Sequence, residues 1–570
     1  MQPQTPNAPD LRNLIIAIGA ATIIMLGWQY FYERPRLQAV AVAQKAAAKL
    51  EASHKAEVTP VAPPAHTDTA TEPTGPRIRI NSAALHGSIA LHGARFDDLT
   101  LAQYHETTEP ASPEVRLLSP ATADTAYFSE IGVLPADTDV RVPDANTQWQ
   151  SDSTELTPER PVTLRWNNGA GLTFEKKIAL DTHYLFTITT TVKNTGAKAV
   201  TLYPYALVSR NYTDTGSHTY FMHEGPLGVV RNALEDITYK KLREDGPQKF
   251  ENTPGWIGMT DKYWLAAVIP EKESFDAGFK HFKRGEHDAY QSDLRGEPLE
   301  IAPGTTTDFT MHLFAGAKEV KLLDAYRAQF NIPLFDRAVD FGSLYFLTKP
   351  FFLALNYFHS LFGNFGIAIL LLTICVKLVL FPLANKSLTS MARTKQLMPK
   401  VTELRERYGK DKMKMNQEIM ALYKREKVNP AAGCLPLLLQ IPVFLALYRV
   451  LFVTIEMRQA PFFGWIHDLS APDPTNIFTV FGLIPWDAPH FLHLGIWPMV
   501  MCVTMVIQQR LNPKPADEVQ AMVMNYMPFM FLFLFAGFPA GLVIYWAWNN
   551  TLTILQQLYI NRGLTKKGLR

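Results

Sequence analysis

The chain has 570 residues, of which 47% are hydrophobic, and its 55 Lys and Arg nearly balance 53 Asp and Glu, for a net charge of +2. These averages are typical of a soluble enzyme, but the apolar residues are segregated: the 43 consecutive residues 519–561 contain no Asp, Glu, Lys or Arg. As a helix this run is about 65 Å long and can cross a hydrocarbon core of about 30 Å twice. It therefore excludes a purely soluble protein, and the placement of all three cysteines in apolar segments excludes a disulfide-stapled secreted one.

The first predicted element is an apolar segment, residues 14–32, that ends in the aromatic cluster Trp28, Tyr30, Phe31 and Tyr32. Aromatic side chains favour the membrane interface, which indicates an uncleaved transmembrane anchor over 1–33. Small residues just beyond it leave a cleaved signal peptide as the alternative. The next stretch, 34–76, is rich in Ala, Pro, Thr, Lys and Glu and predicts a flexible linker.

A β-sandwich domain is predicted over 77–318. Its segments alternate apolar and polar residues and are rich in Thr, Tyr and Val, as in YLFTITTTVKN, and turn signals such as Asn194-Thr195-Gly196 separate them. We find no nucleophile–base pair or paired carboxylates there, so we predict no catalysis. The scattered histidines His86, His92 and His105 favour ordinary surface residues over a metal site.

Residues 319–362 predict helices that lead back to the membrane. A short helix over 320–330 is followed by two interfacial amphipathic helices, 335–347 and 351–362, with aromatic residues at helical spacing. A single longer, tilted helix is the alternative for the last two.

Five further spans are predicted after these helices, and with the anchor they make six. The turn signal GFPAG at 537–541 divides the long apolar run into the last two. The predicted spans are 363–383, 434–455, 488–509, 519–537 and 541–560. The predicted connections are a cytoplasmic helical hairpin at 384–433, a periplasmic loop at 456–487, a cytoplasmic loop at 510–518 and a basic tail at 561–570.

Basic residues set the orientation. The hairpin holds 12 Lys and Arg against 5 Asp and Glu, the 510–518 loop contains Arg510 and Lys514, and the tail is basic. These three segments lie on the cytoplasmic side if both termini are cytoplasmic and the β-domain is exported. The hairpin's charge suggests anionic headgroups or ribosomal RNA as neighbours, and a simple topology signal is the alternative.

Polar residues interrupt the spans. Lys377 and Gln440 are each six residues from the cytoplasmic end of their spans, so they are expected at the same depth. The last span adds Asn549 and Asn550, followed by Thr551 and Thr553. Snorkelling to headgroups is the alternative for Lys377, but the amides cannot reach so far.

We interpret these residues as a wet, positively charged pocket that opens to the cytoplasm. No acidic residue interrupts the five later spans, which argues against a cation transporter and favours an acidic or hydrated polypeptide segment. Arg449 is near the outer end of its span and is expected to snorkel. Met and aromatic residues beside the pocket can accommodate varied apolar partners, with plain helix packing as the alternative. They are Phe444, Met505, Met524, Met527, Phe529, Met530, Tyr545 and Trp546.

Four segments carry a resemblance to a known family. They are FPL-(x)n-SLTSMARTKQLMPK (381–400), YKREKVNPAAGCLPLLLQIPVFLALYRVL (423–451), PFFGWIHDLSAPDP (461–474) and GFPAGLVIYWAWNNTLTILQQ (537–557). In these segments the chain resembles YidC-type membrane protein insertases of Gram-negative bacteria, and the likeness extends over its whole length. The resemblance implies a polytopic α-helical membrane protein, with six spans and a five-helix insertase core, that carries a large periplasmic all-β sandwich domain.

The resemblance also implies function and site. Such a protein inserts and folds proteins of the bacterial inner membrane, alone or with the Sec translocon, and is not an enzyme. Its partners would be nascent membrane proteins, the lipid bilayer, the Sec translocon and, through the cytoplasmic loops and basic tail, the ribosome; no cofactor, metal or small-molecule substrate is implied. The family has arginine at the position of Lys377, so the charge is kept here without the planar fork. By the resemblance, Thr373, Gln440, Ile441, Phe444, Tyr545 and Trp546 line the groove or the adjoining slide for the client helix. With Lys377 and the polar residues Asn549 and Asn550 of the last span, they are the candidate site.

Two other function classes stay open. A small-solute transporter would need an internal repeat or broken helices, and we see no repeat. A membrane-anchored periplasmic sugar-binding protein would lose its activity when 77–318 is deleted, whereas an insertase would tolerate much of that deletion.

Overall fold

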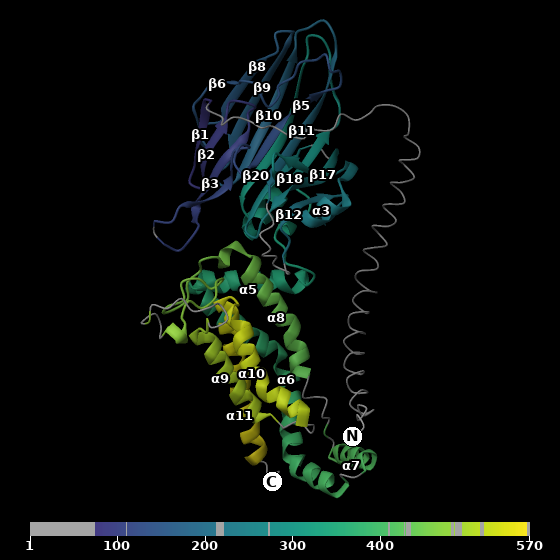
Figure 1. Cartoon of the computed structure of the whole chain (residues 1–570), viewed down its shortest axis with the longest axis vertical. Helices are drawn as coiled ribbons and strands as arrows, with labels where there is room; N and C mark the ends of the chain where they lie inside the picture. The colour runs from purple at the N-terminus through teal and green to yellow at the C-terminus, as the bar shows by residue number, and fades with distance from the viewer. Residues whose placement is uncertain are drawn as a thin grey trace. The chain divides into compact units, whose positions relative to one another are not determined.

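The computed structural model describes residues 75–109, 111–212, 222–271, 274–408, 411–426, 428, 435–479, 484, 493–512 and 518–566. They belong to one compact unit, Pro63–Arg570. The predicted anchor and the predicted linker as far as residue 74 lie outside the described residues. A β-domain and a helical region make up the described part of the chain (Figure 1).

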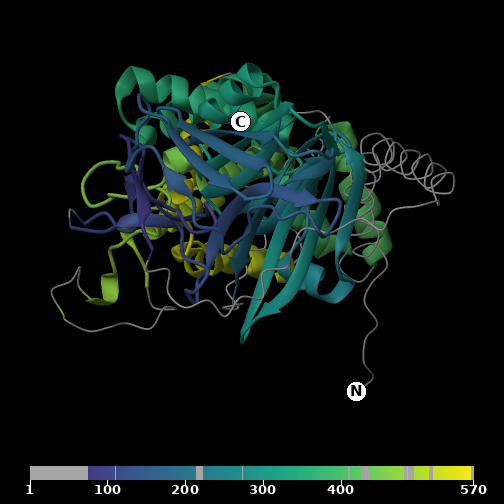
Figure 2. The same cartoon turned by 90° about the horizontal axis from the view of Figure 1, so that it is seen from above.

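Two sheets build the β-domain. The first runs in the order β14 (Gln248–Thr253), β17 (Phe275–Arg284), β18 (His287–Gly296), β11 (Val200–Asn211), β5 (Tyr127–Pro135), β3 (Phe96–His105), β2 (Leu85–Ala90), β1 (Arg77–Asn81) and β7 (Glu155–Leu156), with β19 (Leu299–Ile301) on β11 and β4 (Glu114–Leu118) on β3. The second runs in the order β13 (Ala233–Asp236), β12 (Gly225–Val230), β15 (Gly255–Thr260), β16 (Trp264–Pro270), β20 (Thr306–Ala317), β10 (Leu185–Asn194), β9 (Leu172–Leu180), β8 (Val162–Asn167) and β6 (Gln150–Ser151). A short helix, α3 (Tyr239–Asp245), packs beside β17 (Figures 1 and 2).

Alternation along the strands produces the sandwich. In β9 every second residue from Leu172 to Leu180 is buried, because successive side chains of a strand point to opposite faces. Phe186 of β10 meets Phe96 of β3 edge to face, with 5.1 Å between ring centroids, so side chains from the two sheets share one core. The predicted sandwich is confirmed.

The segment between the two regions differs in part from the prediction. The helix α4 (Val320–Gln329) is present as expected. The predicted helix over 335–347 is wrong: it is replaced by a 3-10 turn, η2 (Phe335–Ala338), and an irregular stretch. Gly342 has a φ of +69°, which ends any helix there, and its N–H donates to Asp340 Oδ1 at 3.0 Å. The following helix, α5 (Tyr345–Phe362), contains Pro350 and is longer than the predicted 351–362.

The helical region consists of α6 (Phe365–Tyr408), α7 (Lys412–Arg425), α8 (Leu435–Val453), α9 (Ile496–Leu511), α10 (Glu518–Ala536) and α11 (Ala540–Lys566). By length and composition, α6 is the one helix among the described residues that could cross a membrane, and Gln440–Val453 and Ala521–Ala536 are shorter apolar helices. α6 continues through Pro382 and Pro399 without a break, so the residues of the predicted second span and of the first hairpin arm share one helix. α11 packs on both α6 and α9 (Figure 1).

One loop gathers the starts of three helices. The N–H groups of Ala540 and Gly541 at the start of α11 donate to backbone oxygens of Ala471 and Leu469, at 2.7 and 3.0 Å. At the start of α6, Gly366 lies so close to the Phe462 ring that a Cβ there would be 1.9 Å from a ring carbon. At the start of α9, Asp473 accepts from the backbone. The loop residues in these contacts all belong to 461–474, one of the four segments that carry the family resemblance.

A hydrogen bond to Glu456 links the start of α4 to the turn η4 (Ile455–Met457), which follows α8. Glu456 Oε1 accepts a 3.1 Å hydrogen bond from Val320 N at the start of α4. Its other oxygen is buried and has no hydrogen-bond partner among the described residues. Burial raises the pKa of Glu456 to about 7.

This raised pKa predicts a pH-dependent stability. The folded chain binds the Glu456 proton more tightly than the unfolded chain, so this carboxyl should lower the free energy of unfolding as pH rises from about 4.5 to 7. Glu456→Gln should remove that loss of stability. Above pH 7 the variant should be more stable than the unaltered chain by roughly 2 kcal/mol, a value below that of the full pKa shift because the side chain is partly exposed to solvent. Thermal unfolding of the detergent-solubilised chain at pH 5 and 8 measures it. Glu418→Gln removes an exposed carboxylate and is the control; equal pH dependence in both variants would refute the assignment.

Candidate functional site

Three polar residues of α11 share one face. Tyr545, Asn549 and Thr553 are spaced by four residues, and residues four apart on a helix are neighbours on its surface. The first lies opposite α8 and the last opposite α6, as their hydrogen bonds show. This face of α11 is therefore the line along which the predicted residues meet.

Lys377 reaches α11 from α6. Its Nζ donates a 2.6 Å hydrogen bond to Thr553 Oγ1, and that hydroxyl in turn donates to the Asn549 backbone oxygen at 2.7 Å. The lysine side chain is half-buried. One turn earlier, the buried Thr373 hydroxyl donates to the Ile369 backbone oxygen at 2.7 Å. The Lys377 ammonium is thus directed at α11.

Gln440 reaches the same face from α8. Its amide Nε2 donates to the Tyr545 hydroxyl, and the tyrosine is buried. Tyr545 and Thr553 are eight residues apart, about 12 Å along a helix. Gln440 and Lys377 therefore bind α11 about two turns apart, with Asn549 between their partners, and the expectation that they reach the same depth is wrong.

An aromatic cluster lies beside this polar line. Phe444 and Trp546 meet edge to face with 4.9 Å between centroids, and Phe535 of α10 lies 5.0 Å from Trp546 and 6.1 Å from Phe444. The cluster joins α8, α10 and α11. It therefore supports a role in helix packing for Phe444 and Trp546, the two of these residues that the sequence analysis named. Ile441, one residue after Gln440, has 47% of its surface exposed.

Asn550 lies elsewhere. It is buried, and its Nδ2 donates a 3.2 Å hydrogen bond to Thr504 Oγ1 of α9. Two turns on, Gln557 Nε2 donates to Asn512 Oδ1 beyond α9, also at 3.2 Å. Adjacent helical residues do not share a face, so the predicted pair Asn549 and Asn550 divides between two interfaces.

The structure also corrects the expectation for Arg449. Instead of snorkelling, its guanidinium forms an ion pair with Asp340, in which Nη1 donates to Oδ2 at 3.1 Å. The sequence interpretation missed this partner because Asp340 is 109 residues away along the chain. It also omitted Thr553 from the site, although the four-residue spacing from Tyr545 through Asn549 is visible in the sequence.

No group of three or more His, Cys, Asp or Glu that could hold a metal occurs within the described part of the chain. His86 Nδ1 lies 2.8 Å from Glu114 Oε1, and His105 Nδ1 lies 2.8 Å from the Ser112 backbone oxygen. The chemistry available at the α6–α8–α11 site is hydrogen bonding and one ammonium charge.

Comparisons with known proteins cover nearly the whole chain. Residues 77–354 match the family model of the YidC periplasmic domain, and residues 357–567 match that of the 60Kd inner membrane protein. The chain is 46% identical to a membrane protein insertase YidC of Methylobacterium radiotolerans, across 97% of this chain and 95% of that one. It is 48% identical to a membrane protein insertase YidC of Rickettsia bellii, across 97% and 99%. A crystal structure of an active YidC insertase covers 83% of this chain and 90% of its own, at 18% identity and a TM-score of 0.36.

Proposed function

The chain belongs to the YidC family of membrane protein insertases, and on that premise we propose that it passes clients along the polar face of α11. It is a membrane protein insertase of the inner membrane with a periplasmic domain. The comparisons support an insertase role and not a catalytic one.

We propose the six-span topology, with both termini in the cytoplasm. The strong positive charge of 384–433 supports this orientation, with 12 basic against 5 acidic residues. α6 then extends from the membrane into the cytoplasm without a break, and α7 folds back on it. Movement of this hairpin would be transmitted directly to the helix that carries Lys377.

The single observation that carries the mechanism is the polar line on α11. Lys377 of α6 and Gln440 of α8 bind it through Thr553 and Tyr545. A hydrophilic groove open to the cytoplasm shortens the dry path that a client's polar flank must cross, and the Lys377 ammonium attracts acidic flanks into it. The polar groove would consist of Lys377, Gln440, Tyr545 and Asn549, with Thr373 one turn from Lys377. Ile441, Phe444 and Trp546 would lie beside it, whereas Asn550 packs against α9.

The client's apolar segment then leaves between α8 and α10. These helices meet at Phe444 and Phe535, whose ring centroids are 6.1 Å apart, and Ile441 is exposed on α8. Burial of the segment in lipid supplies the driving force, about 25 cal/mol per Å² of apolar surface. No nucleotide is needed. The Sec translocon and the ribosome are proposed partners, the latter through the hairpin, the 510–518 loop and the basic tail.

Crosslinking to nascent chains tests the exit path. A photoreactive residue in place of Ile441, which is 47% exposed, should crosslink a ribosome-bound client with an apolar segment. The same residue in place of Val443, 8% exposed on the same helix, should crosslink several-fold less. Equal yields at both positions would argue against client contact on this side of α8.

A further inference from the structure

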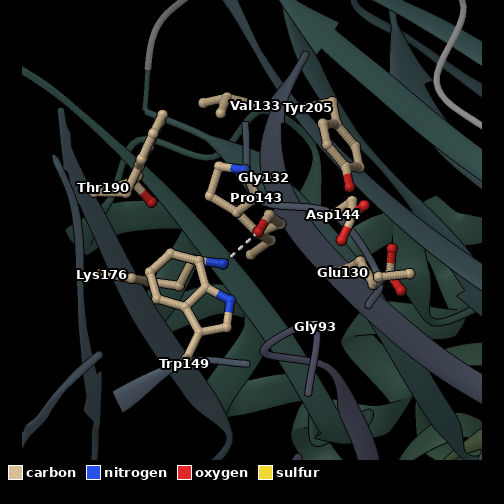
Figure 3. Close-up of a pocket in the computed structure, with 13 residues that line it drawn as sticks. Gly93, Glu130, Gly132, Val133, Pro143, Asp144, Trp149, Lys176, Thr190 and Tyr205 are labelled. Carbon is tan, nitrogen blue, oxygen red and sulfur yellow. Dashed lines mark hydrogen bonds between the residues drawn. The ribbon is translucent and has the colours of Figure 1, made fainter. Parts of the chain in front are cut away.

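A small cavity lies inside the β-domain, between the two sheets (Figure 3). Strands β5, β9, β10 and β11 line it, together with Gly93 and the loop from Pro143 to Trp149. The volume of the cavity is about 20 Å³, and a volume of about 10–15 Å³ accommodates one water molecule. It therefore has room for one or two water-sized groups, such as the oxygens of a carboxylate, and Asp144, which lines it, is exposed.

Three buried donors line this cavity. Lys176 Nζ donates to the Ile131 backbone oxygen at 2.6 Å and, as an ammonium, has further N–H bonds to offer. Thr190 is directly opposite Lys176 in the β9–β10 register, which places the two side chains side by side on one face. Thr190 Oγ1 and Trp149 Nε1 are buried, and neither has a hydrogen-bond partner among the described residues. Their side chains are 2% and 3% exposed.

The acceptors nearby already have donors. Glu130 is paired with Arg95, whose Nε is 2.5 Å from Glu130 Oε1. Asp144 Oδ1 accepts from Asn146 N and Thr147 Oγ1, both at 2.9 Å. Arg95 offsets Glu130 and the Asp144 carboxylate is exposed, so Lys176 is the buried cation among the groups that line the cavity.

A sugar stacked on an aromatic ring does not fit. The Trp149 side chain is 3% exposed, and the Lys176 ammonium lies 5.2 Å from its ring centroid, so the ring is not free to receive a sugar face. The Thr190 and Trp149 donors lack an acceptor among the described residues, because the nearby carboxylates Glu130 and Asp144 accept from other groups. A carboxylate has two oxygens that accept hydrogen bonds and would meet all three donors.

We propose that this cavity binds a carboxylate group through Lys176 Nζ, Trp149 Nε1 and Thr190 Oγ1. The ligand is a small carboxylic acid or the carboxyl end of a peptide in the compartment into which the β-domain is exported. This site is separate from the α6–α8–α11 site and does not depend on the proposed client path. All of the residues that would bind the carboxylate belong to the β-domain.

Affinity should fall as pH rises. The charged or titratable groups that face Lys176 are Glu130, Arg95, Asp144 and Tyr205. Burial lowers the pKa of Lys176 to about 8, opposed by Glu130. A carboxylate binds the ammonium form, so acetate should bind about tenfold more weakly at pH 9 than at pH 7.

The test is an NMR titration of the full chain in detergent micelles with acetate and with its neutral isostere acetamide. We expect saturable binding of acetate and at least tenfold weaker binding of acetamide. Lys176→Met and Thr190→Val should each weaken acetate binding by tenfold or more, while Lys177→Met, at the exposed neighbour, should not. If Lys176→Met does not fold, Thr190→Val and the pH dependence of acetate binding to the unaltered chain still test the proposal.

Triglycine with a free or an amidated carboxyl end distinguishes the two sources. Binding of the free form alone, at least as tight as acetate, identifies a peptide end, and binding of acetate without triglycine identifies a small acid. Equal binding of acetate and acetamide, or no binding of either, would overturn the proposal and leave a water-filled packing cavity. Equal loss in Lys177→Met and Lys176→Met would overturn it as well.

Discussion

Lys377→Met is expected to slow the insertion of a client with an acidic flank about tenfold, equivalent to about 1.4 kcal/mol. The side chain keeps its length but loses the ammonium that donates to Thr553. An opposite charge at about 4 Å in an environment of effective dielectric constant near 20 contributes about 4 kcal/mol, so a tenfold effect is modest for a groove that is partly hydrated. Lys377→Arg should retain insertion, because the positive charge is what the mechanism needs.

The decisive variant is Lys377→Glu, which should repel the same flank and insert it more slowly than Lys377→Met does. The measurement is the rate of client insertion and the growth of a strain depleted of its own insertase. Lys386→Met is the matched control, because Lys386 is an exposed lysine on the same helix. A client with an uncharged flank should be nearly indifferent to all of these changes. Complementation by Lys377→Glu as full as that by Lys377→Arg would exclude a positive groove.

Asp473→Ala is expected to destabilise the helical region by about 2–4 kcal/mol, because it removes the acceptor for three partly buried donors at once. The carboxylate is 2% exposed. Its Oδ2 accepts from Trp497 N at 2.9 Å in the first turn of α9, and its Oδ1 accepts from Thr475 N at 3.0 Å and Thr475 Oγ1 at 2.7 Å. It acts as an N-terminal cap supplied by a distant loop, and its negative charge favours the start of that helix.

Thermal unfolding in detergent measures this effect, and Asp468→Ala is the control. Asp468 makes the same local turn with Ser470, through the Ser470 N–H and hydroxyl at 2.7 Å, and no hydrogen bond to a helix start is found for it among the described residues. Its removal should cost less than about 1 kcal/mol. If the two variants lose equal stability, the local turn and not the cap explains the role of Asp473.

Local patterns predicted much of this chain. The period-2 alternation of segments such as Leu172–Leu180 predicted the sandwich, since one buried face is a property of each strand by itself. The charge-free run 519–561 predicted two apolar helices with a turn between them, and α10 and α11 meet at that turn. The motifs at 381–400, 423–451, 461–474 and 537–557 identified the family that the comparisons then showed.

Tertiary structure alone decided which polar groups meet. Composition along the last apolar helix cannot distinguish Asn549 from Asn550, but Asn549 shares the helix face of Tyr545 and Thr553, whereas Asn550 bonds to Thr504 of α9. The pairing of Arg449 with Asp340 and the capping of α9 by Asp473 join residues 109 and 24 positions apart. Such pairings depend on how whole helices and loops pack, whereas periodicity reports only the face that one element buries.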